Sequence, residues 1–223
     1  VIVVMRKETK IMSTDNILFL AVITFFALLL RVLLFPFESG DYHQFLQGWY
    51  AALKNNGGFA AVGMNIGDYM PTYIYLLAAF TYLPFSDLTA IKIISCIADI
   101  VLAAFVMKTV NLYYEDKTYG IIAYAVTLLL PSVILNSAVW GQCDSIFTAA
   151  LVACVYFFIK NEEVKAVTAY SIAFVFKLQA VFLAPFLLLL LIKRRVKLRT
   201  FLVFPLVYLI AILPAAIMGR NFR

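Results

Sequence analysis

The sequence contains few charged residues. Asp, Glu, Lys and Arg make up only 13% of its 223 residues, about half of the roughly 25% that soluble domains carry. Hydrophobic residues make up 65%, and several uninterrupted runs reach or approach the roughly 20 apolar residues that a membrane-spanning helix needs. Because helices satisfy their backbone hydrogen bonds internally, this composition excludes an ordinary soluble domain. It predicts an all-α, polytopic transmembrane helical bundle in the cell membrane.

Cysteine and histidine are scarce as well. The chain has three cysteines, Cys96, Cys143 and Cys154, and a single histidine, His43. Their spacing gives neither a disulfide framework nor a set of metal ligands. Cys96 and Cys154 lie in apolar runs, where we expect them to be buried. The sequence therefore specifies no metal site and requires no cofactor, although its acidic residues are compatible with a divalent cation.

Acidic residues are fewer than basic ones, 12 against 18, and the net charge is +6. The basic residues fall in short segments at the ends of apolar runs, which is the pattern of the positive-inside rule and not of a nucleic-acid-binding surface. We therefore expect the lipid bilayer, and no nucleic acid, as a partner. The segments placed in the cytoplasm by this rule are 108–117, 160–165, 193–199 and the N-terminus with Arg6, Lys7 and Lys10.

The apolar runs predict the topology. Spans are expected at 17–35, 88–107, 119–138, 145–159 and 200–218. No small-residue cleavage site follows the first run, so it is expected to be an uncleaved anchor. Arg31, near its outer end, is expected to snorkel to the headgroups.

Two apolar runs do not fit a single crossing if all the basic segments are cytoplasmic. We expect 70–86 to be a re-entrant or interfacial helix on the outer side. We expect 166–192 to form two half-helices that turn at Lys177-Leu178-Gln179, since broken helices at membrane depth are tolerated where they line a cavity. In a competing topology, 70–86 is a true span and residues 140–145 lie inside.

Residues 36–69 form the first extracytoplasmic loop. Within it, segment 42–53 carries apolar and aromatic side chains at helical spacing, which predicts a short amphipathic helix in the membrane interface. These side chains are Phe45, Leu46, Trp49, Tyr50 and Leu53.

The favoured topology brings distant acidic residues to one face. Glu38, Asp41, Asp68, Asp87 and Asp144 all fall on the extracytoplasmic side, with Lys177 at the same depth. A carboxylate beside a membrane cavity can serve as a general base, and a lysine can bind a lipid-linked phosphate.

Simpler structural roles compete with these functional ones. Segment 38–43 can be a solvated turn, Asp68 can cap a helix, and Lys177 can snorkel. His43 fits a surface or capping role. Asp99 lies in the middle of a span, with Lys92 two turns earlier on the same face, and we expect it to pack inward in a structural role.

Five segments in order resemble a known family. They are ESGDY at 38–42, GDYMPTYIYLL at 67–77, LTAIKIISCIADI at 88–100, LLLPSVILNSAVWGQCDS at 128–145 and AFVFKLQAVFLAPFLLLL at 173–190. They resemble bacterial relatives of the PIG-V-type mannosyltransferases, in the GT-C superfamily of integral-membrane glycosyltransferases. The resemblance runs from about residue 36 to residue 220.

The resemblance implies a GT-C-like fold and an inverting transferase. Such an enzyme moves a hexose, mannose in particular, from a polyprenyl-phosphate sugar to the hydroxyl of an extracytoplasmic glycan or lipid-linked acceptor. Asp41 matches the base in the first loop, where Glu38 is a second catalytic candidate. Asp144 matches a second acid that orients the acceptor or helps to hold a metal, and Lys177 a cation that faces the donor phosphate. The remaining substrate-binding candidates are Gln142, Gln179, Trp140, Tyr69 and His43.

The chain departs from these relatives in two places. It has Met70-Pro71-Thr72 where relatives often have two prolines, and the relatives continue for several further spans. We therefore expect residues 1–223 to be a single GT-C-like module truncated at its C-terminus. The alternatives are a lipid-carrier transporter or flippase and a non-catalytic scaffold subunit.

Overall fold

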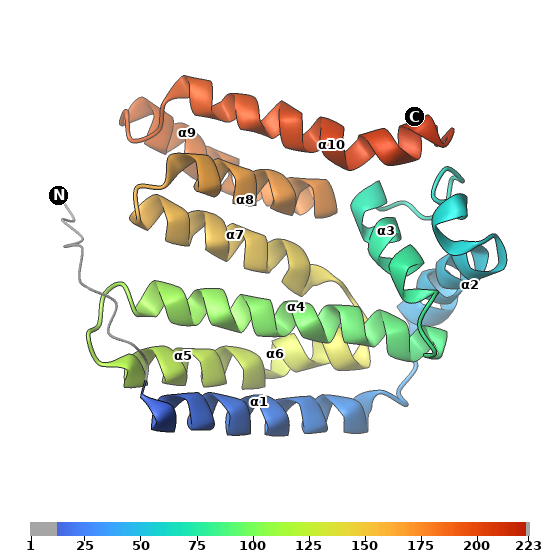
Figure 1. Ribbon diagram of the computed structural model, residues 1–223, viewed down its shortest axis with the longest axis horizontal. Helices are drawn as coiled ribbons and strands as arrows, with labels where there is room; N and C mark the ends of the chain where they lie inside the picture. Colours follow the sequence, from blue (N-terminus) through green and yellow to red (C-terminus); the bar gives the residue numbers. More distant parts are fainter. Residues whose placement is uncertain (1–12, 222–223) are drawn as a thin grey trace.

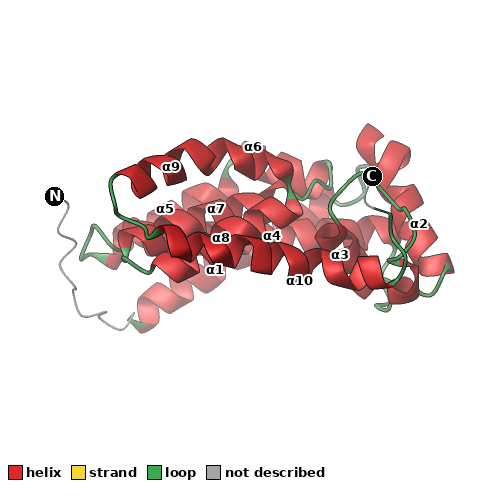
Figure 2. Cartoon of the chain, turned by 90° about the horizontal axis from the view of Figure 1, so that it is seen from above, coloured by secondary structure: helices red, strands yellow, loops and turns green. Residues whose placement is uncertain are grey.

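The computed structural model describes residues 13–221, and every secondary structure element in that range is a helix. Figure 1 shows them as an elongated bundle, and Figure 2 shows that the loops gather mainly at its two ends. In chain order they are α1 (Thr14–Leu34), η1 (Tyr42–Leu46), α2 (Gln47–Asn55), η2 (Gly58–Ala61), α3 (Pro71–Phe80), α4 (Asp87–Val110), α5 (Lys117–Leu129), α6 (Pro131–Ile134), η3 (Leu135–Val139), α7 (Asp144–Ile159), α8 (Glu163–Phe176), η4 (Leu178–Leu183), α9 (Ala184–Ile192), η5 (Leu198–Leu202) and α10 (Val203–Ile217). The all-α prediction is confirmed.

Three helices are long and apolar enough to cross a membrane: α1, α4 and the continuous stretch Leu198–Ile217. A fourth candidate is α5 together with α6 and η3, which is bent by 48°. The bend lies at Leu130, whose extended backbone precedes Pro131, because a residue before proline is disfavoured in the helical conformation. The sequence predicted one span over 119–138, and the structure divides it there.

Two ends of the bundle can be distinguished in Figure 1. The connections α4–α5, α7–α8 and α9–α10 lie at the end where α1 begins, and we call this the basic end. The helices η1, α2 and α3, the starts of α4 and α7 and the end of α10 lie at the other end, which we call the site end.

Neither 70–86 nor 166–192 forms one long helix. α3 has only 10 residues and lies at the site end (Figure 1). α8 ends at Phe176, Lys177 is extended (φ −151°, ψ 127°), and η4 and α9 run back toward the basic end. The chain therefore turns back at Lys177, as the two half-helices predicted from the sequence would.

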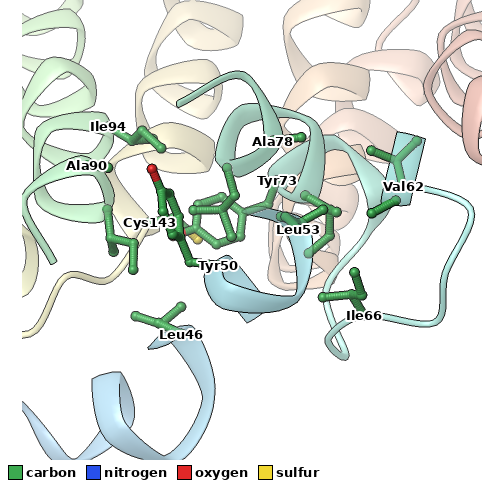
Figure 3. Close-up of a cluster of buried hydrophobic side chains, with 14 of the residues drawn as sticks. Leu46, Tyr50, Leu53, Val62, Ile66, Tyr73, Ala78, Ala90, Ile94 and Cys143 are labelled. Carbon is green, nitrogen blue, oxygen red and sulfur yellow. The ribbon is translucent and has the colours of Figure 1, made fainter. Parts of the chain in front are cut away.

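The largest buried apolar cluster lies at the site end and not in the middle of the bundle (Figure 3). The helix over 42–55 buries Tyr42, Leu46, Tyr50 and Leu53, at spacings of four, four and three residues. These side chains pack on α3 and α4 and on Cys143. The amphipathic helix predicted for 42–53 is present, and its buried stripe fixes the first loop against the bundle.

Charged side chains are buried inside the bundle. Arg31 is 0% exposed, and its Nε lies 2.9 Å from Asp99 Oδ2, so the expectation that Arg31 reaches the headgroups is wrong. An ionised Asp within a span needs a partner, and Arg31 is the partner of Asp99. The inward packing expected for Asp99 is confirmed.

The other buried cation and the three cysteines also lie inside the protein. Lys92 donates through its Nζ to the carbonyls of Leu34, Phe35 and Phe37 at the end of α1. All three cysteines are buried and free.

Candidate functional site

Ser39 positions the start of the helix that carries Asp41. Its Oγ accepts from the backbone N–H of Tyr42 at 3.1 Å and donates to the carbonyl of Trp140 at 3.0 Å. The first loop is thereby tied to the turn at 140–143. The helix continues in the π form over Tyr42–Leu46, a local widening that is often found at functional sites.

The turn at 140–143 brings Gln142 to Asp41. Gly141 has φ +69°, and a Cβ on it would lie 3.3 Å from Ile91 Cγ2 of α4. Glycine adopts this conformation without steric cost, so the chain can turn tightly against α4. The Nε2 of Gln142 then donates to Asp41 Oδ2 at 2.7 Å, which orients the carboxylate.

Tyr69 extends this contact across the site. Its hydroxyl donates to Gln142 Oε1 at 3.3 Å, and its ring meets Trp49 edge to face at 5.3 Å between centroids. Gly67 allows Trp49 to lie close to the backbone, since a Cβ there would be 2.9 Å from the indole. Burial raises the pKa of the Tyr69 phenol, so the group stays a neutral donor at physiological pH.

These residues line a small cavity of about 150 Å³ at the site end. Its walls combine two carboxylates, an amide and aromatic rings, which together suit a polar ligand with apolar faces. The lining residues are Asp41, Phe45, Leu46, Trp49, Asp68, Tyr69 and Gln142.

An ion pair lies beside the cavity. Lys177 Nζ donates to Asp144 Oδ1, and Asn136 Nδ2 donates to Asp144 Oδ2 at 3.0 Å. The same ammonium lies 5.7 Å from the ring centroid of Tyr69 and 5.7 Å from that of Phe147. Burial acts against the charged form of Lys177, but the hydrogen bond and charge of Asp144 outweigh it and raise its pKa. The ammonium is therefore fully charged at neutral pH.

The site thus joins residues from four distant segments. Asp41, Gln142 and Tyr69 form one hydrogen-bonded chain, and Tyr69 also contacts Lys177, which pairs with Asp144. Five of the nine residues singled out in the sequence are brought together in this way.

The other four candidates lie outside the cavity lining. Glu38 and His43 pair with each other, Nε2 to Oε2 at 2.9 Å, with both side chains about half exposed. The side chain of Trp140 is exposed, and its contact with the first loop is made by its backbone carbonyl, which accepts from Ser39. Gln179 is exposed at the start of η4. Their assignment to substrate binding or catalysis stays a prediction.

Five lining or supporting residues are not among the nine candidates predicted from the sequence: Phe45, Leu46, Trp49, Asp68 and Asn136. Asn136 lies eight positions before Asp144, and spacing alone gives no sign of their contact. Phe45 and Trp49 belong to the predicted amphipathic stripe, which was assigned to the membrane interface. Asp68 was open to two interpretations; the N-cap of α3 is Met70, without a side-chain hydrogen bond, so Asp68 does not cap that helix and instead lines the cavity.

Among the described residues, no group of three or more His, Cys, Asp and Glu side chains is arranged to hold a metal ion. No protein-family model matches the chain, and no curated protein or solved structure matches it.

Proposed function

We propose that this protein is a GT-C-type membrane glycosyltransferase that transfers a hexose, with mannose the first candidate, from a polyprenyl-phosphate sugar to an acceptor hydroxyl. One observation carries the proposal. A carboxylate, Asp41, and a partly buried ammonium, Lys177, come from segments more than 130 positions apart and meet at one cavity: Gln142 links Asp41 to Tyr69, whose ring contacts Lys177. The five sequence segments that resemble the GT-C relatives supply most of these residues.

The proposed reaction is a single displacement. Asp41 takes the proton of the acceptor hydroxyl as its oxygen attacks the anomeric carbon. The bond between that carbon and the phosphate oxygen breaks, and the lipid phosphate leaves with the electron pair. Lys177 stabilises the charge that develops on this phosphate. An ammonium has three donors, so Lys177 can hold the phosphate while Asp144 keeps it in place.

Attack from the face opposite the leaving phosphate inverts the anomeric configuration. Gln142 is suited to orient Asp41 for this attack, because it holds one carboxylate oxygen at 2.7 Å. Trp49 and Tyr69 offer apolar ring surface for the sugar, and Asp68 offers an acceptor for its hydroxyl groups.

We place the site end on the extracytoplasmic side. The basic end carries nine of the lysines and arginines of the described chain, and the positive-inside rule puts such segments in the cytoplasm. They are Lys108, Lys117, Lys160, Lys165, Lys193, Arg194, Arg195, Lys197 and Arg199. The basic N-terminal residues that support the same orientation lie outside the described residues.

A transfer assay tests the proposal. The chain, reconstituted in lipid nanodiscs, is given polyprenyl-phosphate-mannose with radiolabelled sugar and a membrane lipid extract as the acceptor source. We expect labelled lipid product from the wild type and at least a tenfold lower turnover from Asp41→Asn and from Asp144→Asn. Asp15→Asn, which removes a carboxylate at the basic end, is the matched control and should keep full turnover. Equal turnover in all four proteins, or no transfer by the wild type, would reject the assignment.

A lipid-carrier transporter is the second candidate, since the broken pair α8 and α9 is typical of helices that line a transport path. In proteoliposomes this candidate predicts movement of polyprenyl phosphate between leaflets without any change in its sugar. Movement without transfer would favour it over the transferase.

A further inference from the structure

Asp99 is a buried carboxylate in the middle of the bundle that contacts several helices. It is 0% exposed and accepts hydrogen bonds from three side chains on three other helices. Arg31 donates from α1 at 2.9 Å, Ser137 from η3 at 2.5 Å and Ser145 from α7 at 2.5 Å. One carboxylate of α4 therefore holds three neighbouring helices.

The two serines stand on either side of the turn that carries Gln142. Ser137 precedes the turn and Ser145 follows it. Asp99 therefore accepts a hydrogen bond from each side of the turn. Ser137 is adjacent to Asn136 and Ser145 is adjacent to Asp144, and the side chains of Asn136 and Asp144 bond to each other at 3.0 Å. Successive residues of a helix point about 100° apart. Fixing the serines toward Asp99 thus sets the directions of their neighbours.

Burying the Arg31–Asp99 ion pair costs free energy of desolvation. An ion pair inside a bundle loses hydration that its own attraction barely repays, and well-packed apolar residues in its place are often as stable or more stable. The hydrogen bonds of Asp99 to both sides of the turn give this carboxylate a positional role in addition to any stabilising one.

We propose that Asp99 is a positioning residue: through Ser137 and Ser145 it fixes the turn at 140–143 and the helix ends beside it. Asn136, Gln142 and Asp144 are thereby directed toward Asp41 and Lys177. The effect on catalysis rests on the proposed function, whereas the fixing of the turn does not. Ser145→Ala is the sharpest perturbation, because it removes one hydrogen bond to Asp99 and leaves the Arg31–Asp99 pair intact.

Cys143 reports the state of the turn directly. It lies between Gln142 and Asp144 and is 3% exposed, so a thiol reagent reaches it only when the turn opens. In a background with Cys96→Ala and Cys154→Ala, the labelling rate of Cys143 by a maleimide is measured in nanodiscs. We expect Ser145→Ala to raise this rate at least fivefold, and Ser145→Thr, which keeps the hydroxyl, to stay within twofold of the wild type.

Ser171→Ala is the matched control. Ser171 is also 0% exposed, but its hydroxyl donates to Val167 O of its own helix at 2.7 Å. We expect this variant to leave Cys143 as protected as in the wild type. If Ser145→Ala and Ser171→Ala give the same labelling rate, the proposal is overturned. Should Ser145→Ala not assemble, Ser137→Ala is measured in the same way and decides in its place.

The transfer assay separates positioning from stability. We expect Ser145→Ala to lower kcat at least fivefold with KM within twofold, at an unfolding temperature close to that of Ser171→Ala. Absence of transfer in the wild type would reject the glycosyltransferase and leave the labelling result standing. Unchanged labelling with an active wild type would reject only the role of Asp99.

Discussion

At the scale of single residues, the charge of Arg31 is balanced inside the bundle. Its guanidinium donates to Asp99, to the carbonyl of Ala27 at 3.1 Å and to that of Leu128 at 2.8 Å. Three helices, α1, α4 and α5, are thereby joined by one side chain. Removing one member of such a pair leaves the other buried without a partner.

Arg31→Leu is therefore expected to destabilise the protein by about 3–5 kcal/mol, the cost of leaving Asp99 buried and uncompensated. The double variant Arg31→Leu/Asp99→Leu should recover most of that loss, because no buried charge remains. Thermal unfolding in detergent, followed by the fluorescence of Trp49 and Trp140, measures both. Arg195→Leu, which removes an exposed arginine at the basic end, should change little. Equal unfolding temperatures for the single and double variants would contradict the expectation.

The position of Arg31 could not be predicted from the sequence. Its place near the end of an apolar run favours snorkelling, and its partner lies 68 positions away in another run. Asp41, Asp144 and Lys177 could be assigned to one end of the bundle, because basic segments and apolar runs constrain which loops share a side. Their actual contacts, through Gln142, Tyr69 and Asn136, depend on side-chain directions that only the packed structure provides.

At the scale of elements, α10 contains Pro214, and Tyr75 of α3 hydrogen-bonds to the α10 backbone beside this proline. A proline within a helix lacks the N–H that bonds to the preceding turn. The hydroxyl of Tyr75 donates to Ala211 O at 3.0 Å and accepts from the backbone N–H of Ala215 at 3.0 Å. Tyr75 thus bridges two backbone groups that would otherwise bond to each other, as side chains inserted at helix kinks do.

Tyr75→Phe is expected to cost about 1–3 kcal/mol, since it leaves part-buried backbone groups without their partner. In a Pro214→Ala background the loss should be smaller, because α10 can then close its own hydrogen bond. A double-mutant cycle of unfolding free energies measures this coupling, which we expect at about 0.5 kcal/mol or more. Tyr113→Phe, on an exposed tyrosine near the basic end, serves as the control. A coupling near zero would show that Tyr75 and Pro214 act separately.

The helices themselves and the break at Lys177 could be predicted from simple patterns, whereas the other irregularities could not. Apolar length predicted α1, α4, α7 and the last span, and helical spacing predicted the helix over 42–53. The π-helical segments Tyr42–Leu46 and Leu135–Val139 have no local signature, because they arise where the chain adjusts to neighbouring helices. Pro131 could have marked the break in the fourth span, since proline favours the first turn of a new helix.

At the scale of the whole molecule, the distribution of charge sets the expected orientation. The fold class could be predicted from composition alone, because a chain so rich in apolar runs has few ways to satisfy its backbone in a bilayer. The relation to GT-C transferases stays a proposal carried by the five resembling segments and by the geometry of the site.

Cysteine labelling tests the orientation. In a background without native cysteines, Asn55→Cys places a thiol on the exposed end of α2 and Arg195→Cys places one at the basic end. An impermeant maleimide added to intact cells should label Asn55→Cys and leave Arg195→Cys unlabelled until the membrane is opened. Tyr113→Cys, in the α4–α5 connection, should behave like Arg195→Cys. Labelling of Arg195→Cys from outside would show that the orientation is opposite to the one proposed.

Under the proposed function, the shortness of α8 bears on how the lipid-linked donor would reach Lys177. Its 14 residues extend about 21 Å, whereas the hydrocarbon core is about 30 Å thick. One response to such a mismatch is local thinning of the bilayer, which would bring the lipid surface toward Lys177 at the end of the helix. A polyprenyl phosphate diffusing sideways in the leaflet would descend with that surface. It would meet the ammonium without lifting its chain out of the membrane.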